Sequence, residues 1–246
     1  MNRKYEFTGE TTNYFGHTLH RIKAISSFGS VKKGDIGGWI ESEENLSASG
    51  NAWVFGNAWV SDDARVFGNA WVSDDARVSG NAWVSDNARV SGNAWVSGNA
   101  WVSGNAWVSD DAWVSDDARV SGNAWVSGKA WVSGKARVSD DAWVSGKARV
   151  SGKARVSGNA WVSGNAGVSD DALVCGEYDF ITMGPIGSRS DITTFYHLKQ
   201  GGIGVNCGCF NGTLDEFETA VHETHAGTEH EKAYMAAIRM AMRVLK

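Results

Sequence analysis

Residues 91–114 read SGNAWVSGNAWVSGNAWVSDDAWV, and this stretch decides the fold. It belongs to a six-residue unit, [N/D/K]-A-[W/R]-V-[S/F]-[G/D], which runs without interruption over residues 51–174. Alanine and valine each occupy their position in all 21 copies. The position between them varies, with 12 Trp and seven Arg before it ends in Gly167 and Leu173. A period this short and this regular is typical of a solenoid.

The alternation of side chains along a strand explains the pattern. Successive side chains point to opposite faces, so Ala-Trp-Val predicts in, out, in. Seven buried and unpaired guanidinium groups would be prohibitive, which places the Trp/Arg position outside and the alanine and valine inside. The Ser-Gly-Asn and Ser-Asp-Asp segments predict bends, because Gly, Asn and Asp tolerate positive φ or hydrogen-bond locally. A strand of three residues and a bend of three residues, repeated, make a β-solenoid.

The unit V-S-G-N-A-W resembles the hexapeptide repeat, in which an aliphatic residue recurs at every sixth position and a small residue lies two positions before it. That resemblance covers about half of the chain and implies a left-handed parallel β-helix with three hexads in each triangular coil. The 21 hexads then make seven coils of 18 residues, about 34 Å long at a strand spacing of ~4.8 Å. The expected fold class is mainly β: an N-terminal β cap (1–45), this solenoid (46–176) and a small C-terminal α+β domain (177–246).

A period of 18 residues sorts the variable positions onto three faces of the prism. One face is nearly all tryptophan, and its seven positions are Trp53, Trp71, Arg89, Trp107, Trp125, Trp143 and Trp161. Indoles on adjacent coils can stack, and an arginine in the row can lie on a ring face. Such a strip either stiffens the solenoid or marks a partner surface, and a platform for stacking sugars or bases is a further reading. We expect a homo-oligomer, with a trimer favoured because hexapeptide-repeat solenoids often associate side by side.

Composition and charge limit the class of protein. The formal net charge of the chain is −5, which makes nucleic acid an unlikely partner. Within the repeat, residues 62–117 carry nine Asp against three Arg, whereas residues 119–155 carry eight basic residues against two Asp. This axial asymmetry could favour an anionic partner or end-to-end association. Three cysteines argue against a disulfide framework, and the absence of a signal-like or membrane-length apolar run predicts a soluble, cytoplasmic protein without a cofactor.

The two end pieces are expected to cap the solenoid, since an open coil edge invites further strand addition. GDIGGWIESEENLS (34–47) resembles the segment that leads into the repeat of uncharacterised hexapeptide-repeat proteins of bacteria and their prophages. In the C-terminal piece we predict strands near 178–183, 192–198 and 203–209. Two helices are expected to follow, each opened by a capping box, at Thr213-Leu-Asp-Glu and Thr228-Glu-His-Glu.

Any ligand site is expected in the C-terminal domain, where two candidate sets occur. The first would hold a phosphate or carboxylate with hydroxyls, a guanidinium and the free N–H groups of a helix start; its members are Ser188, Arg189, Thr193, Thr194, Gly212 and Thr213. The second is a metal site, whose soft and nitrogen ligands would be Cys207, Cys209, His222 and His225. The Cys-x-Cys spacing is tighter than in a usual zinc knuckle, so no metal is the preferred expectation. A Cys–His nucleophile lacks an identifiable orienting residue.

These observations favour a non-enzymatic scaffold or binding protein, a rigid self-associating solenoid that presents its C-terminal module. Two binding alternatives remain: the C-terminal domain sequesters an anionic, nucleotide-like molecule, or the tryptophan strips bind glycans. The hexapeptide-repeat resemblance also implies acyl transfer, in which a histidine acts as the base. This chain has no histidine between His20 and His197, and no loop interrupts its repeat, so no catalytic residue can be assigned.

Overall fold

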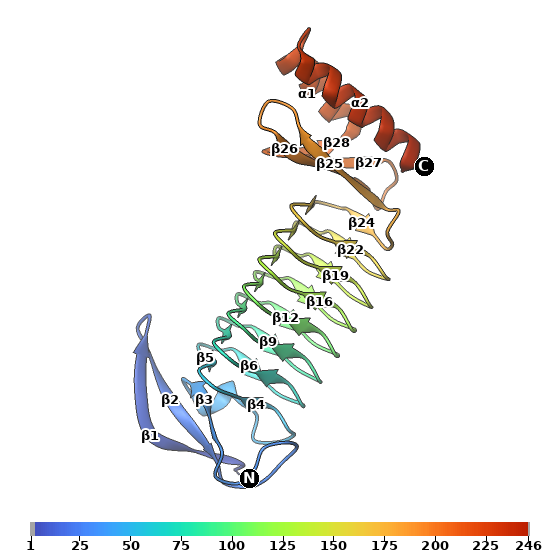
Figure 1. Cartoon of the computed structure of the whole chain (residues 1–246). Helices are drawn as coiled ribbons and strands as arrows, with labels where there is room; N and C mark the ends of the chain where they lie inside the picture. Colours follow the sequence, from blue (N-terminus) through green and yellow to red (C-terminus); the bar gives the residue numbers. More distant parts are fainter. Residues whose placement is uncertain (1–2, 246) are drawn as a thin grey trace.

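The computed structural model describes residues 3–245 as an elongated prism of stacked coils (Figure 1). The N-terminal strands lie at one end of the prism and the two helices at the other, so the chain ends are far apart. The fold is a β-solenoid of mainly β structure with a small antiparallel sheet and two helices at its C-terminal end. No helix among residues 3–245 is long and apolar enough to cross a membrane.

The N-terminal piece is a hairpin that continues into the solenoid. Strands β1 (Tyr5–Tyr14) and β2 (His17–Ala24) are antiparallel, and β3 (Ile36–Ile40) pairs antiparallel with β2. On its other edge β3 is parallel to the first strand of the repeat in its sheet, so it is already a rung of the solenoid. A 3-10 turn at Glu43–Asn45 and a parallel bridge from Leu46 add to this incomplete coil. The solenoid therefore has about eight turns, of which the repeat supplies seven.

Three parallel sheets form the sides of the prism, and each of their two-residue strands ends on a repeat valine. The first sheet contains β4 (Trp53–Val54), β7 (Trp71–Val72), β10 (Arg89–Val90), β13 (Trp107–Val108), β16 (Trp125–Val126), β19 (Trp143–Val144) and β22 (Trp161–Val162). The second adds to β3 the strands β5 (Trp59–Val60), β8 (Arg77–Val78), β11 (Trp95–Val96), β14 (Trp113–Val114), β17 (Trp131–Val132), β20 (Arg149–Val150) and β23 (Gly167–Val168). The third contains β6 (Arg65–Val66), β9 (Trp83–Val84), β12 (Trp101–Val102), β15 (Arg119–Val120), β18 (Arg137–Val138), β21 (Arg155–Val156) and β24 (Leu173–Val174).

The predicted coil of 18 residues is confirmed by the register of these sheets. Trp107 faces Trp125 and Val108 faces Val126, and the same offset holds in all three sheets. All 21 repeat alanines and all 21 repeat valines are buried, none more than 1% exposed. They form one continuous core because each coil covers the apolar face of the next. The bends take the left-handed conformation expected of their residues, as at Gly98 (φ 67°) and Asp62 (φ 57°).

The C-terminal piece is a four-stranded antiparallel sheet covered by two helices. Its strands are β25 (Phe180–Ile186), β26 (Asp191–His197), β27 (Ile203–Cys207) and β28 (Phe210–Thr213), paired in sequence order. The helices α1 (Leu214–His225) and α2 (Glu229–Val244) pack their apolar stripes on this sheet. Three strands and both helices agree with the prediction.

Two features of this piece differ from the prediction. Strand β28 was not expected, because Cys-Gly-Cys-Phe-Asn-Gly has the composition of a loop; Gly208 (φ 59°) makes a tight turn that lets Phe210 pair with Cys207. The capping box at Thr213 forms, with Glu216 as its partner. At Thr228 only half of the box forms: the Glu231 carboxylate accepts from Gly227 N–H (2.6 Å) and contacts His222 instead.

Candidate functional site

The C-terminal sheet is joined to the last coil by buried polar contacts. Gly167 N–H donates to Thr194 Oγ1 (3.0 Å), while Ser169 Oγ lies 3.1 Å from Tyr196 Oη and donates to Asn211 Oδ1 (2.7 Å). Thr194 and Tyr196 are almost completely buried there. The module therefore sits on the solenoid in a single defined position.

Gly167 is the only glycine at the variable position of the repeat, and the junction explains it. A Cβ at this position would overlap the side-chain amide of Asn206 on β27. The Trp or Arg found at the equivalent positions of other coils would prevent the sheet from approaching. This break in the repeat marks the docking face for the C-terminal module.

A cavity of about 370 Å³ opens at the far end of the C-terminal module. Its apolar wall comes from β28 and α1, with Phe210, Phe217 and Val221. Its polar rim comes from the β25–β26 turn, with Ser188 and Arg189, and from the end of β27. This volume and this mixture of an apolar wall with a few polar groups are typical of sites for small molecules.

Tyr234 on α2 closes the inner side of the cavity. Burial raises its pKa to about 12, and the hydrogen bond to Cys207 adds to the effect, so the phenol stays neutral at physiological pH. The Cys207 thiol lies 3.8 Å from the phenol oxygen and accepts from Thr193 Oγ1 (3.1 Å). The His225 ring packs on Tyr234 with 5.7 Å between ring centroids. These groups make a neutral, hydrogen-bonded inner wall under a charged rim.

The predicted anion set does not converge. Ser188 and Arg189 line the cavity, but Thr193 is buried beneath it and Thr194 faces the solenoid. Gly212 and Thr213 belong to β28 next to the start of α1, whereas the cavity is lined by the second half of that helix, including Val221, Thr224 and His225. The N-cap is also already occupied, because Glu216 Oε2 accepts Thr213 N–H at 2.8 Å. A carboxylate of the chain itself fills the place expected for an anion.

The predicted metal set is brought only partly together. Cys207, Cys209 and His225 line the same cavity, but the His222 imidazole is paired with Glu231 at 2.7 Å. Among residues 3–245, one group of three His, Cys, Asp or Glu side chains has its ligand atoms within 4.8 Å of one another, and that group lies at the opposite end of the molecule.

The predicted tryptophan face forms a stacked ladder. Trp107, Trp125, Trp143 and Trp161 are nearly parallel, with 4.9–5.2 Å between adjacent ring centroids. Each indole Nε1 donates to a serine hydroxyl 16 residues earlier, as in Trp125 to Ser109 (3.1 Å). Arg89 lies over a ring face, as expected. The ladder thus stiffens the solenoid.

Trp53 does not belong to the predicted partner surface. Its side chain is fully buried, because Tyr5 and Phe28 of the N-terminal piece pack edge-on against it. Trp71 is half-buried and is separated from the stacked rings by Arg89. The exposed part of this face is therefore confined to the coils from Trp107 to Trp161.

The comparison with known families bears on the repeat region. A family model described as YdcK Beta solenoid repeat matches residues 58–74, 70–86, 82–98, 112–128, 118–134, 148–164 and 154–170. This chain is a β-solenoid repeat protein. No curated protein matches the chain. All of the matched segments lie inside the solenoid, so the family model carries no information on the C-terminal cavity.

Several residues of the cavity were not identified from the sequence, notably Asp191, Thr224 and Tyr234. Tyr234 was assigned only to the apolar stripe of its helix, which is correct but incomplete. The signal that could have drawn attention to it is Gly187, because a side chain there would overlap the Tyr234 ring. A glycine needed for close approach points to a partner, but the sequence does not say which one.

Proposed function

We propose that this protein is a non-enzymatic spacer, which holds its C-terminal module at a fixed distance and orientation from its N-terminal end. The observation that carries the proposal is the buried junction, in which Gly167, Ser169 and Asp170 of the last coil bond to Thr194, Tyr196 and Asn211 of the module. A flexible linker would leave these groups in water. The continuous core and the indole ladder supply the stiffness between the two ends.

The proposal includes self-association through the stacked tryptophan face. Trp107 and Trp161 keep 37% and 52% of their surface exposed although they lie in a ladder. Apolar rings at this exposure, repeated along one face, are a suitable contact surface for a second copy. We expect three solenoids side by side, with their axes parallel.

The sequence of the repeat supports a non-enzymatic role. Acyl transfer would need a histidine base near the solenoid, yet the histidines closest to the repeat are His20 and His197. In the structure His197 pairs with Asp179. The three cysteines are all free thiols, which fits a reducing compartment such as the cytoplasm. Association with prophages remains a prediction from residues 34–47.

The spacer role is tested with Gly167→Arg in the full-length chain. Limited proteolysis and small-angle X-ray scattering should report a rigid rod for the wild type, resistant to cleavage in the connection at 175–179. In Gly167→Arg the module should detach, so that the connection is cleaved and the maximum dimension increases.

Trp131→Arg is the matched control, because it makes the exchange that the repeat itself makes on the same face and should leave the module docked. Cleavage of the wild type at the connection as fast as the variant would contradict the proposal. So would a Gly167→Arg protein that stays rigid.

A second candidate function is the binding of a small amphiphilic anion, and the C-terminal cavity favours it. Its aromatic wall would hold an apolar body, while Arg189 on the rim would pair with a negative group. This is the sequestration alternative with its predicted helix start removed. It is compatible with the spacer role, because the cavity lies on the side of the module away from the junction.

A further inference from the structure

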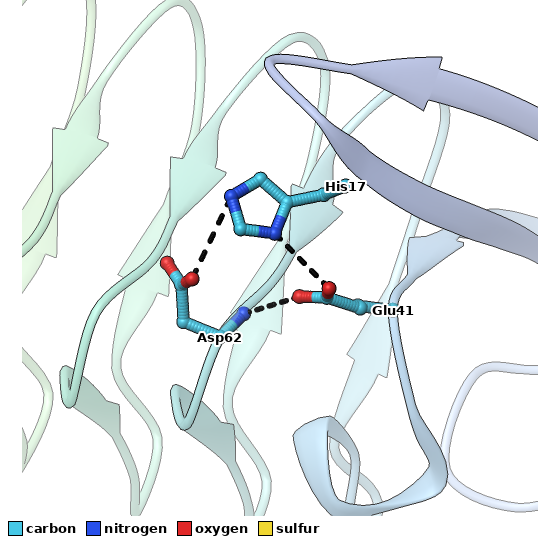
Figure 2. A group of neighbouring side chains, drawn as sticks. All are labelled: His17, Glu41 and Asp62. Carbon is cyan, nitrogen blue, oxygen red and sulfur yellow. Dashed lines mark hydrogen bonds and ion pairs between the residues drawn. The ribbon is translucent and has the colours of Figure 1, made fainter.

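The N-terminal hairpin meets the solenoid at a cluster of three side chains, His17, Glu41 and Asp62 (Figure 2). His17 begins β2, Glu41 follows β3, and Asp62 is in the bend before β6. The imidazole lies between the two carboxylates, with Nδ1 3.0 Å from Glu41 Oε1 and Nε2 3.6 Å from Asp62 Oδ1. About a third of each side chain is exposed, so solvent and small ions can reach the cluster.

Asp62 occupies a position of the repeat that is normally structural. At six bends the aspartate Oδ2 accepts the N–H of the glycine 18 residues later; these residues are Asp62, Asp74, Asp86, Asp110, Asp116 and Asp140. Within residues 3–245, only at Asp62 do an imidazole and a second carboxylate join the aspartate. The solenoid forms without such a cluster at the other five bends, so the fold alone does not account for it.

Both carboxylates are fixed by backbone donors. Glu41 Oε2 accepts Asp62 N–H (2.6 Å), and Asp62 Oδ2 accepts Gly80 N–H (2.8 Å). Each carboxylate therefore keeps one oxygen, Glu41 Oε1 or Asp62 Oδ1, directed at the ring of His17 (Figure 2). Side chains held in this way have lost little freedom left to lose on binding an ion.

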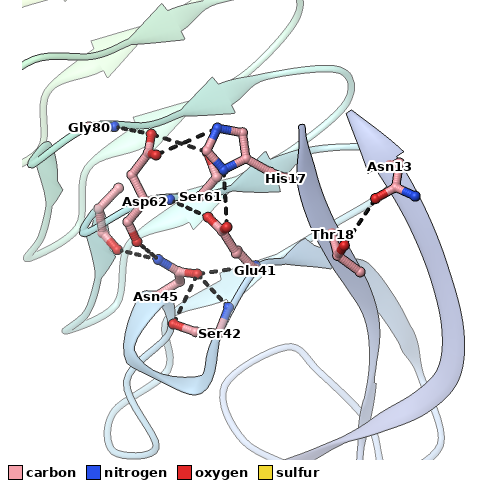
Figure 3. A network of polar contacts seen from close by, with 10 residues as sticks. Asn13, His17, Thr18, Glu41, Ser42, Asn45, Ser61, Asp62 and Gly80 are labelled. Carbon is pink, nitrogen blue, oxygen red and sulfur yellow. Dashed lines mark hydrogen bonds and ion pairs between the residues drawn. The ribbon is translucent and has the colours of Figure 1, made fainter. Parts of the chain in front are cut away.

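A buried asparagine holds the two backbones that carry the carboxylates (Figure 3). Asn45 Oδ1 accepts the N–H groups of Glu41 (3.1 Å) and Ser42 (2.8 Å), and Asn45 Nδ2 donates to the carbonyls of Asp62 (2.8 Å) and Ala64 (2.9 Å). Asn45 is completely buried and uses its whole amide in these bonds. The positions of Glu41 and Asp62 relative to each other are thus set by the fold.

We propose that this cluster binds one divalent transition-metal ion of the zinc class, with His17 Nε2 and Asp62 Oδ1 as direct ligands. Zinc bonds to nitrogen and oxygen are 2.0–2.2 Å long, so two tetrahedral ligands lie about 3.5 Å apart. The 3.6 Å between Nε2 and Oδ1 matches that separation. His17 Nδ1–H then donates to Glu41, the carboxylate–histidine–metal arrangement that orients many ligating histidines. Water fills the remaining positions from the open side.

The ion would link the hairpin to the first repeat coil. His17 is the only one of the three side chains on the β1–β2 hairpin, so the bonds through it join this hairpin to the solenoid. Glu41 raises the pKa of His17 through their hydrogen bond, so a proton competes with the ion. Binding is therefore best measured at about pH 8, above the ordinary histidine pKa.

The test is zinc titration calorimetry on the full-length chain without a polyhistidine tag. The wild type should bind one more Zn²⁺ per chain than His17→Ala does. His20→Ala is the matched control, because His20 lies on the same strand but stacks on Phe7, and it should keep the wild-type stoichiometry. Glu41→Gln should retain the site and bind Zn²⁺ about 10–100-fold more weakly, as expected for a positioning carboxylate.

Asp62→Asn guards against a misfolded variant, because its amide oxygen can still accept Gly80 N–H while its NH₂ group faces the imidazole. It should also lose one Zn²⁺ per chain. Hydrogen exchange supplies a second readout: zinc should slow exchange in residues 17–24 of the wild type and leave His17→Ala unchanged. Equal zinc stoichiometry in the wild type, His17→Ala and Asp62→Asn would overturn the proposal and leave the cluster as a histidine–carboxylate clamp.

Discussion

Of the residues that line the C-terminal cavity, only Arg189 carries a permanent positive charge. Its guanidinium is on an exposed turn, opposite an aromatic wall that includes Phe210 and Phe217. Asp191 lies on the same rim and can orient the guanidinium without neutralising a bound anion completely. A ligand that combines a flat apolar body with one negative group would satisfy both parts of the cavity.

Arg189→Gln should therefore weaken the binding of such a ligand. The probe is 8-anilinonaphthalene-1-sulfonate, followed by its fluorescence. Loss of one charge-assisted hydrogen bond, about 1.5 kcal/mol, predicts a Kd about tenfold higher. Arg137→Gln, which removes a charge from the solenoid instead, should leave the Kd unchanged. A probe that binds both variants and the wild type equally would exclude Arg189 from the site.

At the scale of single residues, the sequence predicted which side chains are inside but not which ones meet. Arg189 and Ser188 were recognised as polar groups on a turn, and both line the cavity. Thr194 has the same hydroxyl and was assigned to the same site, yet it faces the last coil. Neighbours in a strand point to opposite faces, so Thr193 and Thr194 could never serve one site.

Among the elements, the indole ladder contributes in proportion to the number of stacks each ring makes. Trp125 lies between Trp107 and Trp143, with interplanar angles of 5° and 2°. Trp161 ends the ladder and stacks on one side only. The serine hydroxyl that receives each indole N–H lies on the previous coil, so the ladder joins coils as well as rings.

Trp125→Leu should lower the free energy of unfolding by about 1–3 kcal/mol, since two stacks at ~0.5–1.5 kcal/mol each are lost. Trp161→Leu removes one stack and should cost about half as much. Urea denaturation, followed by circular dichroism, compares the two. Equal losses for both variants would mean that burial of each ring, and not stacking, accounts for the stabilisation.

Elements with a regular pattern were predictable, whereas those that depend on a partner were not. The two-residue strands follow from the period of six, because in-out-in alternation leaves a single solution. Strand β28 forms only because β27 offers an edge to a segment that reads as a loop. The hairpin β1–β2 was expected as short strands, but its pairing extends to Tyr14 and His17, and this extension carries His17 to the solenoid.

Across the whole molecule, charge is separated along the axis of the prism. The acidic aspartates lie in the coils nearest the N-terminal hairpin, and the basic residues lie in the coils nearest the C-terminal module. A side-by-side trimer with parallel axes would bring like-charged halves together, and its apolar contact would have to outweigh their repulsion. Salt screens that repulsion, with a Debye length of ~10 Å at 0.1 M.

Light scattering should therefore find a mass three times that of the 26.4 kDa chain, and raising the salt from about 0.05 to 0.5 M should tighten the association. Trp143→Lys, which places a charge in the middle of the exposed face, should give monomers. Association that weakens with salt would instead indicate antiparallel or end-to-end pairing of the opposite-charged halves. A monomer at every salt concentration would contradict self-association.

The sequence by itself determined the solenoid, since Ala and Val at every sixth position can be buried together in one way only, and the 18-residue coil follows from it. Tertiary structure decided everything that joins the repeat to its ends. It seats the C-terminal sheet at Gly167, splits the predicted anion set, and places His17 beside Glu41 and Asp62. The physical reason is range: periodic burial is a local property of the chain, whereas these contacts join residues 20 or more positions apart whose approach depends on the shape of both surfaces.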